Sequence, residues 1–162
     1  LKLPILLIIL SIITFSCVDN TNNKSEFQVG IIERNDSKSQ AMDNFTKAYL
    51  ENNLETQIEL FTEDAIIHIN SNDVSPAQMI EEFSKDKEFY DNVENLDRTT
   101  VTMTSDDGNV YSNYWFTWKA TSKSTGVTVS NPVYSWFKWE GDKVSEGAFI
   151  FDPTEYVANM PQ

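Results

Sequence analysis

The second half of the chain alternates long strand-forming runs with short turns, and this alternation most limits the folds open to it. Gly stands beside Asp, Ser or Thr at residues 105–108, 123–126 and 140–142, so turns are expected there. Two of the runs between the turns are longer than an ordinary strand, and Pro132 and Gly147 are expected to mark bulges or bends. The pattern predicts a strongly curved antiparallel sheet. Its β-branched and aromatic runs cover residues 99–105, 109–122, 127–140 and 143–151.

The first half of the domain carries helix signals instead. Ser37 and Gln40 resemble a capping box at the start of a first helix. Asn52 and Glu55 can begin a second, short helix, and a β-prone run follows at residues 65–70. The apolar positions expected to face the core from the first helix are Met42, Phe45 and Tyr49.

The strongest helix start in the chain is Ser75-Pro76-Ala77-Gln78, which combines a cap, a proline at the first helical position and a glutamine at the third. The apolar face of that helix is expected to continue through Phe83 to Tyr90. Helices followed by a curved antiparallel sheet predict an α+β fold, with the helices packed in the concavity of the sheet.

The N-terminus predicts export and a lipid anchor. After Lys2, the apolar run is too short to span a bilayer, so residues 1–16 are interpreted as a signal peptide. The stretch Thr14-Phe15-Ser16-Cys17 resembles the lipobox of bacterial lipoproteins, although that motif prefers a smaller residue than Phe15. The resemblance implies that Cys17, the only cysteine of the chain, is acylated. The alternatives are a plain secretory signal and an uncleaved anchor.

The segment that follows Cys17 is polar. Residues 17–37 are expected to form a tether, and residues 38–162 to form the folded domain, held at a membrane of the bacterial cell envelope. The chain has 12 Lys and Arg against 25 Asp and Glu, a formal net charge of −13. This charge argues against nucleic acid as a partner and against a basic membrane-binding face. Membrane contact is therefore expected through the lipid anchor alone.

The stretch Leu60-Phe61-Thr62-Glu63-Asp64-Ala65-Ile66-Ile67 resembles a junction found in the nuclear transport factor 2-like superfamily, which includes SnoaL-like polyketide cyclases and ketosteroid isomerases. The resemblance implies a conical curved sheet that encloses a pocket. It also implies that the isomerase catalytic positions fall on Phe45, Ile69 and Ser135. None of these side chains can act in an acid–base pair, so that isomerase mechanism is excluded.

Strand alternation assigns the aromatic residues to two faces of the sheet. His68, the only histidine, is expected to face away from the pocket, and no metal site or cofactor is expected. Trp115 and Trp136 fall on the convex face, where they would form an apolar patch and are expected to mediate a homodimer. The expected pocket residues are Phe45, Tyr49, Ile69, Phe83, Tyr114, Phe116, Trp118, Ser135, Phe137 and Trp139.

Three functions remain open from the sequence. The first is non-catalytic binding of a small apolar ligand in the cone. The second is an enzyme, such as a lyase, isomerase or cyclase, that acts on a small organic molecule through Tyr49, Ser135 or an acid that the sequence does not locate. The third is a structural or dimerising module with a filled core. A cavity with buried polar groups about 3 Å apart would favour the enzyme, and a dry apolar cavity would favour binding.

Overall fold

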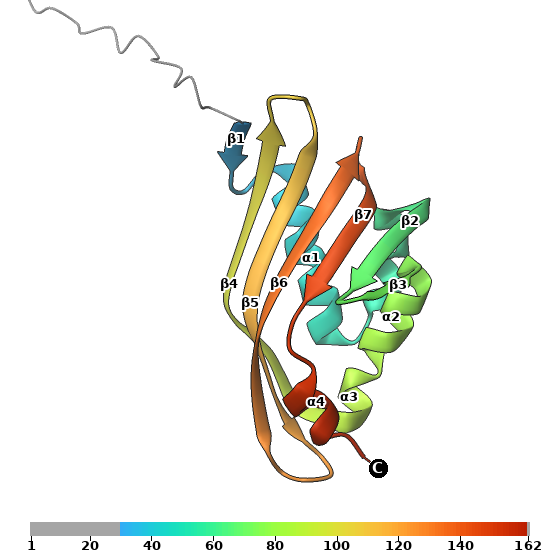
Figure 1. Cartoon of the computed structure of the whole chain (residues 1–162), viewed down its shortest axis with the longest axis vertical. Helices are drawn as coiled ribbons and strands as arrows, with labels where there is room; N and C mark the ends of the chain where they lie inside the picture. Colours follow the sequence, from blue (N-terminus) through green and yellow to red (C-terminus); the bar gives the residue numbers. More distant parts are fainter. Residues whose placement is uncertain (1–29, 162) are drawn as a thin grey trace, which may run out of the picture.

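The computed structural model describes residues 30–161 and shows a seven-stranded sheet in the order β1-β4-β5-β6-β7-β2-β3 (Figure 1). Neighbouring strands are antiparallel except for β2 and β7, which are parallel. The strands are β1 (Gly30–Glu33), β2 (Phe61–Ile69), β3 (Asn72–Val74), β4 (Tyr90–Ser105), β5 (Val110–Ser122), β6 (Thr128–Glu140) and β7 (Lys143–Ile150).

The helices pack on one face of this sheet. In Figure 1, α1 crosses behind β6 and β7, while α4 lies at the lower end of the molecule near α3. This arrangement confirms the α+β fold predicted from the sequence. The helices are α1 (Ser37–Glu51), the 3₁₀ helix η1 (Leu54–Leu60), α2 (Pro76–Ser84), α3 (Asp86–Phe89) and α4 (Thr154–Ala158).

The caps of the helices follow the local sequence, with one shift. Helix α2 begins with the capping box predicted from Ser75 and Gln78, each of which binds the backbone of the other. Helix α1 is capped by Asp36 rather than Ser37, because the Asp36 carboxylate accepts hydrogen bonds from the backbone N–H groups of Lys38 and Ser39. An aspartate at this position also suits the positive end of the helix dipole.

The prediction that the α2 helix runs on to Tyr90 was wrong. Helix α2 ends at Ser84, the short α3 follows, and Tyr90 is the first residue of β4. The chain turns back toward the sheet at this point, which buries the Tyr90 side chain to 1 % exposure. Strand β4 is consequently longer than the run of residues 99–105 that the sequence indicated.

The long strand β4 is irregular at two places. The register between β4 and β5 shifts twice, and Asn92 and Asp97 at these shifts have positive φ angles of 54° and 52°. Pro132 was expected to mark a bend, but it pairs in regular register with Thr117. Gly147 makes room for the Phe137 ring on the neighbouring strand. A Cβ at residue 147 would lie 2.7 Å from the Cδ1 atom of Phe137.

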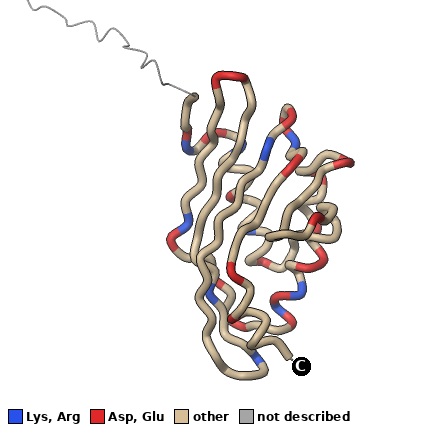
Figure 2. Tube along the Cα trace, in the orientation of Figure 1, with Lys and Arg blue, Asp and Glu red and all other residues tan. Residues whose placement is uncertain are grey.

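Strand β1 extends the sheet beyond β4, with Gly30 paired to Ser105. The folded part therefore begins before residue 38, where the domain boundary was expected. The predicted signal peptide and Cys17 lie outside the described residues. Acidic side chains are spread over helices and turns (Figure 2). None of the helices within residues 30–161 is long and apolar enough to cross a membrane.

Candidate functional site

The helices and the concave face of the sheet line a partly open cavity of about 180 Å³. Its walls come from α1, α2, α3 and α4 on one side and from strands β4 to β7 on the other, with one residue from the end of β2. Most of the walls are aromatic or aliphatic. The lining residues are Phe45, Thr46, Tyr49, Ile69, Glu82, Phe83, Asp86, Asn95, Tyr114, Phe116, Trp118, Asn131, Val133, Phe149, Phe151 and Tyr156.

A buried carboxylate, Asp86, lies at one end of this cavity. It is the first residue of α3, and only 8 % of its surface is exposed. Its Oδ2 atom accepts a hydrogen bond of 2.6 Å from the Tyr49 hydroxyl, and its Oδ1 atom accepts one of 2.6 Å from the Tyr156 hydroxyl. Helix α1 supplies the first tyrosine and helix α4 the second, so this aspartate links three helices.

The hydrogen-bond chain continues onto the sheet. The indole N–H of Trp118, on β5, donates to the Tyr49 hydroxyl at 2.7 Å. Burial raises the pKa of Asp86, while the two tyrosine hydrogen bonds oppose this rise. Burial and the neighbouring Asp86 charge raise the pKa of Tyr49 and of Tyr156 well above their usual range. Both phenols are therefore neutral donors near pH 7.

A second polar group lies on the same cavity wall. The Tyr114 hydroxyl accepts hydrogen bonds from Thr46 at 2.8 Å and from the Asn95 side-chain amide at 3.2 Å. The Asn95 Oδ1 atom is buried and has no hydrogen-bond partner within residues 30–161. This wall therefore offers one buried acceptor atom, Asn95 Oδ1, that no donor of the described chain occupies.

The structure brings most of the predicted pocket residues together. The residues that line the cavity as expected are Phe45, Tyr49, Ile69, Phe83, Tyr114, Phe116 and Trp118. Two of the three positions onto which the resemblance placed isomerase catalytic residues, Phe45 and Ile69, are thus apolar parts of the cavity wall.

The other three predicted pocket residues lie in the packed core, which corrects the prediction. Phe137 is fully buried against the rings of Phe45 and Phe149. Trp139 donates to the Ser112 hydroxyl at 2.9 Å, and Ser135 is fully buried. They share the concave face of β6, where two α1 side chains cover them: the Phe45 ring packs against Phe137, and the Lys38 ammonium lies 4.9 Å from the Trp139 ring centroid.

Sequence reasoning missed Asp86, which gives the cavity its buried charge, and Tyr156, whose phenol donates a hydrogen bond to it. Asp86 stands between two lysines in a polar run, a pattern typical of a solvated surface. Tyr156 follows the last strand and carried no motif. The cavity is therefore not the dry apolar cone expected from the sequence, because it holds buried polar groups within hydrogen-bond distance of one another.

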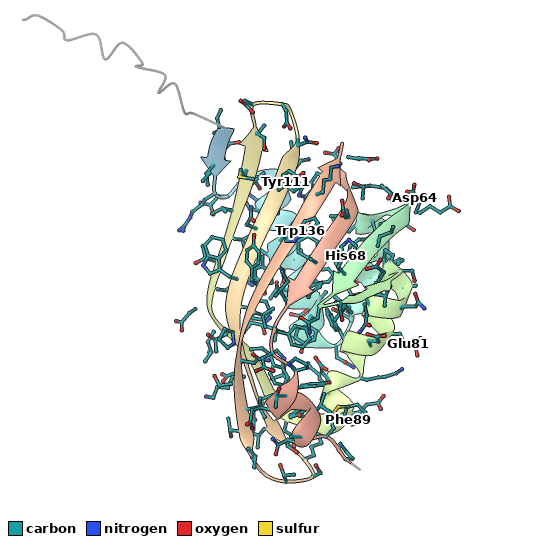
Figure 3. All side chains as sticks on the ribbon, in the orientation of Figure 1. Asp64, His68, Glu81, Phe89, Tyr111 and Trp136 are labelled. Atoms are coloured by element: carbon teal, nitrogen blue, oxygen red, sulfur yellow. The ribbon has the colours of Figure 1, made fainter. Side chains whose placement is uncertain are left out.

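The outer face of the sheet carries the sole histidine, as alternation predicted. His68 Nδ1 lies 2.6 Å from Asp73 Oδ1, and its Nε2 lies 3.2 Å from Glu146 Oε1. Figure 3 shows His68, Trp136 and Tyr111 along this face, and the Trp136 ring lies between the other two, with centroid distances of 6.3 Å and 6.2 Å.

These contacts half-bury Trp136, so it is less available for a partner than the sequence suggested. Trp115 remains 41 % exposed, and Tyr134 and Ile150 are also exposed beside it. Within residues 30–161, no group of three or more His, Cys, Asp or Glu side chains is placed to hold a metal ion.

No family model matches the sequence, and no curated protein matches it. Solved structures do resemble the fold. An NTF2-like protein of unknown function from Burkholderia pseudomallei has a TM-score of 0.59 at 10% identity, covering 78% of this chain and 100% of that one. A proposed polyketide cyclase from Pseudomonas putida has a TM-score of 0.56 at 15% identity, covering 76% and 98%.

A third structure has a ketosteroid isomerase-like fold, comes from Catenulispora acidiphila and was solved in complex with trimethylamine. Its TM-score is 0.56 at 12% identity, and the match covers 75% of this chain and 92% of that one. At these identities the likeness concerns the fold alone. The chain has the nuclear transport factor 2-like fold, with N-terminal helices packed against a curved sheet.

Proposed function

We propose that the cone binds a small, largely apolar organic molecule without transforming it. The observation that carries this proposal is the cavity of about 180 Å³ with mainly aromatic and aliphatic walls. For scale, an engineered apolar cavity of about 150 Å³ binds benzene. A ligand of benzene size or slightly larger fits this volume. The neighbour solved with trimethylamine supports a small organic ligand for this cavity as well.

An acid–base enzyme is the second candidate, and a specific observation favours it. The hydrogen-bonded chain from Trp118 through Tyr49 to Asp86 meets the criterion of buried polar groups about 3 Å apart. The raised pKa of Asp86 also suits a proton-transfer group. Such an enzyme would be a lyase, isomerase or cyclase, in keeping with the proposed cyclases and isomerase among the structural neighbours.

Two features make binding the better supported function. Both oxygens of Asp86 already accept phenol hydrogen bonds, which weakens the carboxylate as a base. The pKa of Tyr49 is raised far from neutrality, so this phenol is a poor proton donor at pH 7. The third alternative, a filled structural module, is disfavoured by the cavity itself.

Ligand binding is testable with an apolar fluorescent probe that quenches Trp118, which lines the cavity. Val133→Phe adds a ring to the cavity wall and should abolish probe binding. Val127→Phe makes the same change at a side chain that is 44 % exposed and outside the cavity, so its binding should match the wild type. Equal binding by both variants would contradict the proposal.

The two candidates differ in what happens to the ligand. A natural ligand can be identified by native mass spectrometry of the purified protein and then incubated with it in D₂O. Recovery of the ligand at unchanged mass is expected for binding alone. Exchange of a carbon-bound hydrogen of the ligand for deuterium would favour the acid–base enzyme instead, provided that the Asp86→Asn variant no longer catalyses this exchange.

We also propose that the chain is a lipoprotein of the bacterial cell envelope, acylated at Cys17. The support is the apolar run that ends at the only cysteine. Cys17→Ser should move the protein from the detergent phase to the aqueous phase in a partitioning experiment. Unchanged partitioning would contradict the anchor.

A homodimer through the convex face is the remaining part of the proposal. Trp115, Tyr134 and Ile150 are exposed together there and line a groove with Pro132. A second copy of the chain would cover this apolar surface. We do not place Trp136 at the centre of this interface, because its ring already packs between His68 and Tyr111.

A further inference from the structure

The Asp86 carboxylate lies in the cavity without a positively charged partner. Its two oxygens accept hydrogen bonds from the neutral phenols of Tyr49 and Tyr156. Within the described chain, no lysine, arginine or histidine forms an ion pair with it. Burial of an uncompensated carboxylate is strongly unfavourable, and the raised pKa of Asp86 reflects this cost. Because both oxygens of Asp86 accept hydrogen bonds from phenols, the group is held as a carboxylate, and its negative charge has no basic partner in the described chain.

The nearest cations in the sequence are engaged elsewhere. Lys85 donates to Glu81 Oε1 at 2.7 Å, and Lys87 donates to the backbone oxygen of Leu50. None of the residues that line the cavity is basic, and one of them, Glu82, is a second acid. The site is thus electrostatically matched to a cation and mismatched to an anion.

The cavity walls favour a cation of a particular kind. Tyr49, Phe83, Phe116, Trp118 and Tyr156 all line the cavity. Aromatic rings carry partial negative charge on their faces and attract ammonium groups, most strongly when water is excluded. The same rings disfavour a bare, strongly hydrated metal ion, because they offer no ligand oxygen to replace its water. A cation with carbon substituents satisfies both the charge and the apolar walls.

Two side chains of the cavity, Asp86 and Asn95, retain acceptor capacity for such a ligand. Each carboxylate oxygen of Asp86 has a second lone pair after its tyrosine bond. The buried Asn95 Oδ1 atom lines the same cavity and has no donor among residues 30–161. A neutral alcohol or amide could donate a hydrogen bond here, but it would leave the charge of Asp86 unbalanced.

If the proposed binding function holds, the geometry points to a small substituted ammonium ion as the ligand class. Its nitrogen lies beside Asp86, and its carbon substituents lie against the aromatic walls. The cavity of about 180 Å³ limits it to a benzene-sized substituent with one or two methyl groups on nitrogen. Secondary and tertiary amines, which are protonated near pH 7, meet this description.

Three probes of nearly equal size test this assignment by calorimetry at neutral pH: N-methylbenzylammonium, benzyl methyl ether and phenylacetate. The ammonium should bind at least about tenfold more tightly than the ether, and phenylacetate should bind most weakly. Asp86→Asn should bring the ammonium and the ether to similar affinity. Glu82→Gln removes the other lining acid and should preserve most of the ammonium preference.

The outcomes separate this inference from the proposed function. Equal binding of ammonium and ether to the wild type, or preferred binding of phenylacetate, overturns the ammonium assignment while small-molecule binding stands. Failure of all three probes and of the apolar fluorescent probe overturns both. The wild-type comparison needs no variant, and ether binding by Asp86→Asn shows that this variant retains the folded cavity.

Discussion

Tyr49→Phe removes a single oxygen atom that serves two buried hydrogen bonds. This oxygen donates to Asp86 at 2.6 Å and accepts from the Trp118 indole at 2.7 Å. A bond to a charged acceptor contributes roughly 1.5–3 kcal/mol, and a buried N–H left without a partner costs roughly 1–3 kcal/mol. Asp86 keeps its bond to Tyr156, so the two contributions overlap. We expect the free energy of unfolding to fall by about 3 kcal/mol.

The measurement is equilibrium unfolding in urea, with a thermal melt as a second readout. For a domain of this size, that loss corresponds to a decrease in Tm of about 6–12 °C. Tyr134→Phe is the matched control, because it also removes one phenol oxygen, which donates to Asn113 Oδ1 at 2.6 Å. The Tyr134 side chain is exposed in the single chain, so in melts at a protein concentration low enough to keep the chain monomeric, water replaces the lost bond and the expected cost is about 0.5 kcal/mol or less.

Equal losses in the two variants would refute the reasoning. They would mean that the buried hydrogen-bond chain contributes no more than an exposed one, for example because water reaches Asp86. A double variant with Asp86→Asn adds a second check. If the two groups interact as the distances indicate, the double variant should lose less stability than the sum of the single variants.

Three further perturbations test the rest of the molecule. Gly147→Ala should cost about 1–3 kcal/mol in urea unfolding by overpacking, because the new Cβ would lie 2.7 Å from Phe137 Cδ1; the cost should shrink in a Phe137→Leu background. The hydrogen bond to Asp73 raises the pKa of His68 above 6.5, so its stabilisation is present below pH 6.5 and lost as pH rises through the raised value. Thermal melts of wild type and His68→Gln should therefore converge at alkaline pH, and a constant difference would contradict this. Trp115→Ser with Tyr134→Ser should convert a dimer to a monomer by light scattering, with unchanged circular dichroism; a wild type that is monomeric at high micromolar concentration would rule out the dimer.

Local signals in the sequence predicted local structure well. The capping box at Ser75 depends on contacts within one turn of helix, so three residues were enough to locate the start of α2. The end of that helix was misplaced because Tyr90 continues the apolar periodicity, whereas its burial depends on distant contacts. Its ring packs against Trp118 and Tyr156, residues that lie far along the chain.

The charge of the site could not be predicted for the same physical reason. Asp86 receives its hydrogen bonds from Tyr49, 37 positions away, and from Tyr156, 70 positions away. No spacing within a single element encodes such a meeting. The aromatic walls were easier to assign, because the period of two along β5 places Tyr114, Phe116 and Trp118 on one face.

The pairing of β1 with β4 fixes where residues 30–33 lie on the folded domain. Figure 1 shows β1 at one end of the sheet and α4, which carries Tyr156, at the other. If Cys17 is acylated, the chain from Cys17 to Gly30 can reach at most roughly 45 Å from the membrane surface when fully extended. The β1 end is then held within that distance of the bilayer. The end that carries Asp86 and Tyr156 is the far end of the domain from this attachment, so an anchor at Cys17 would leave the cavity free to sample solutes.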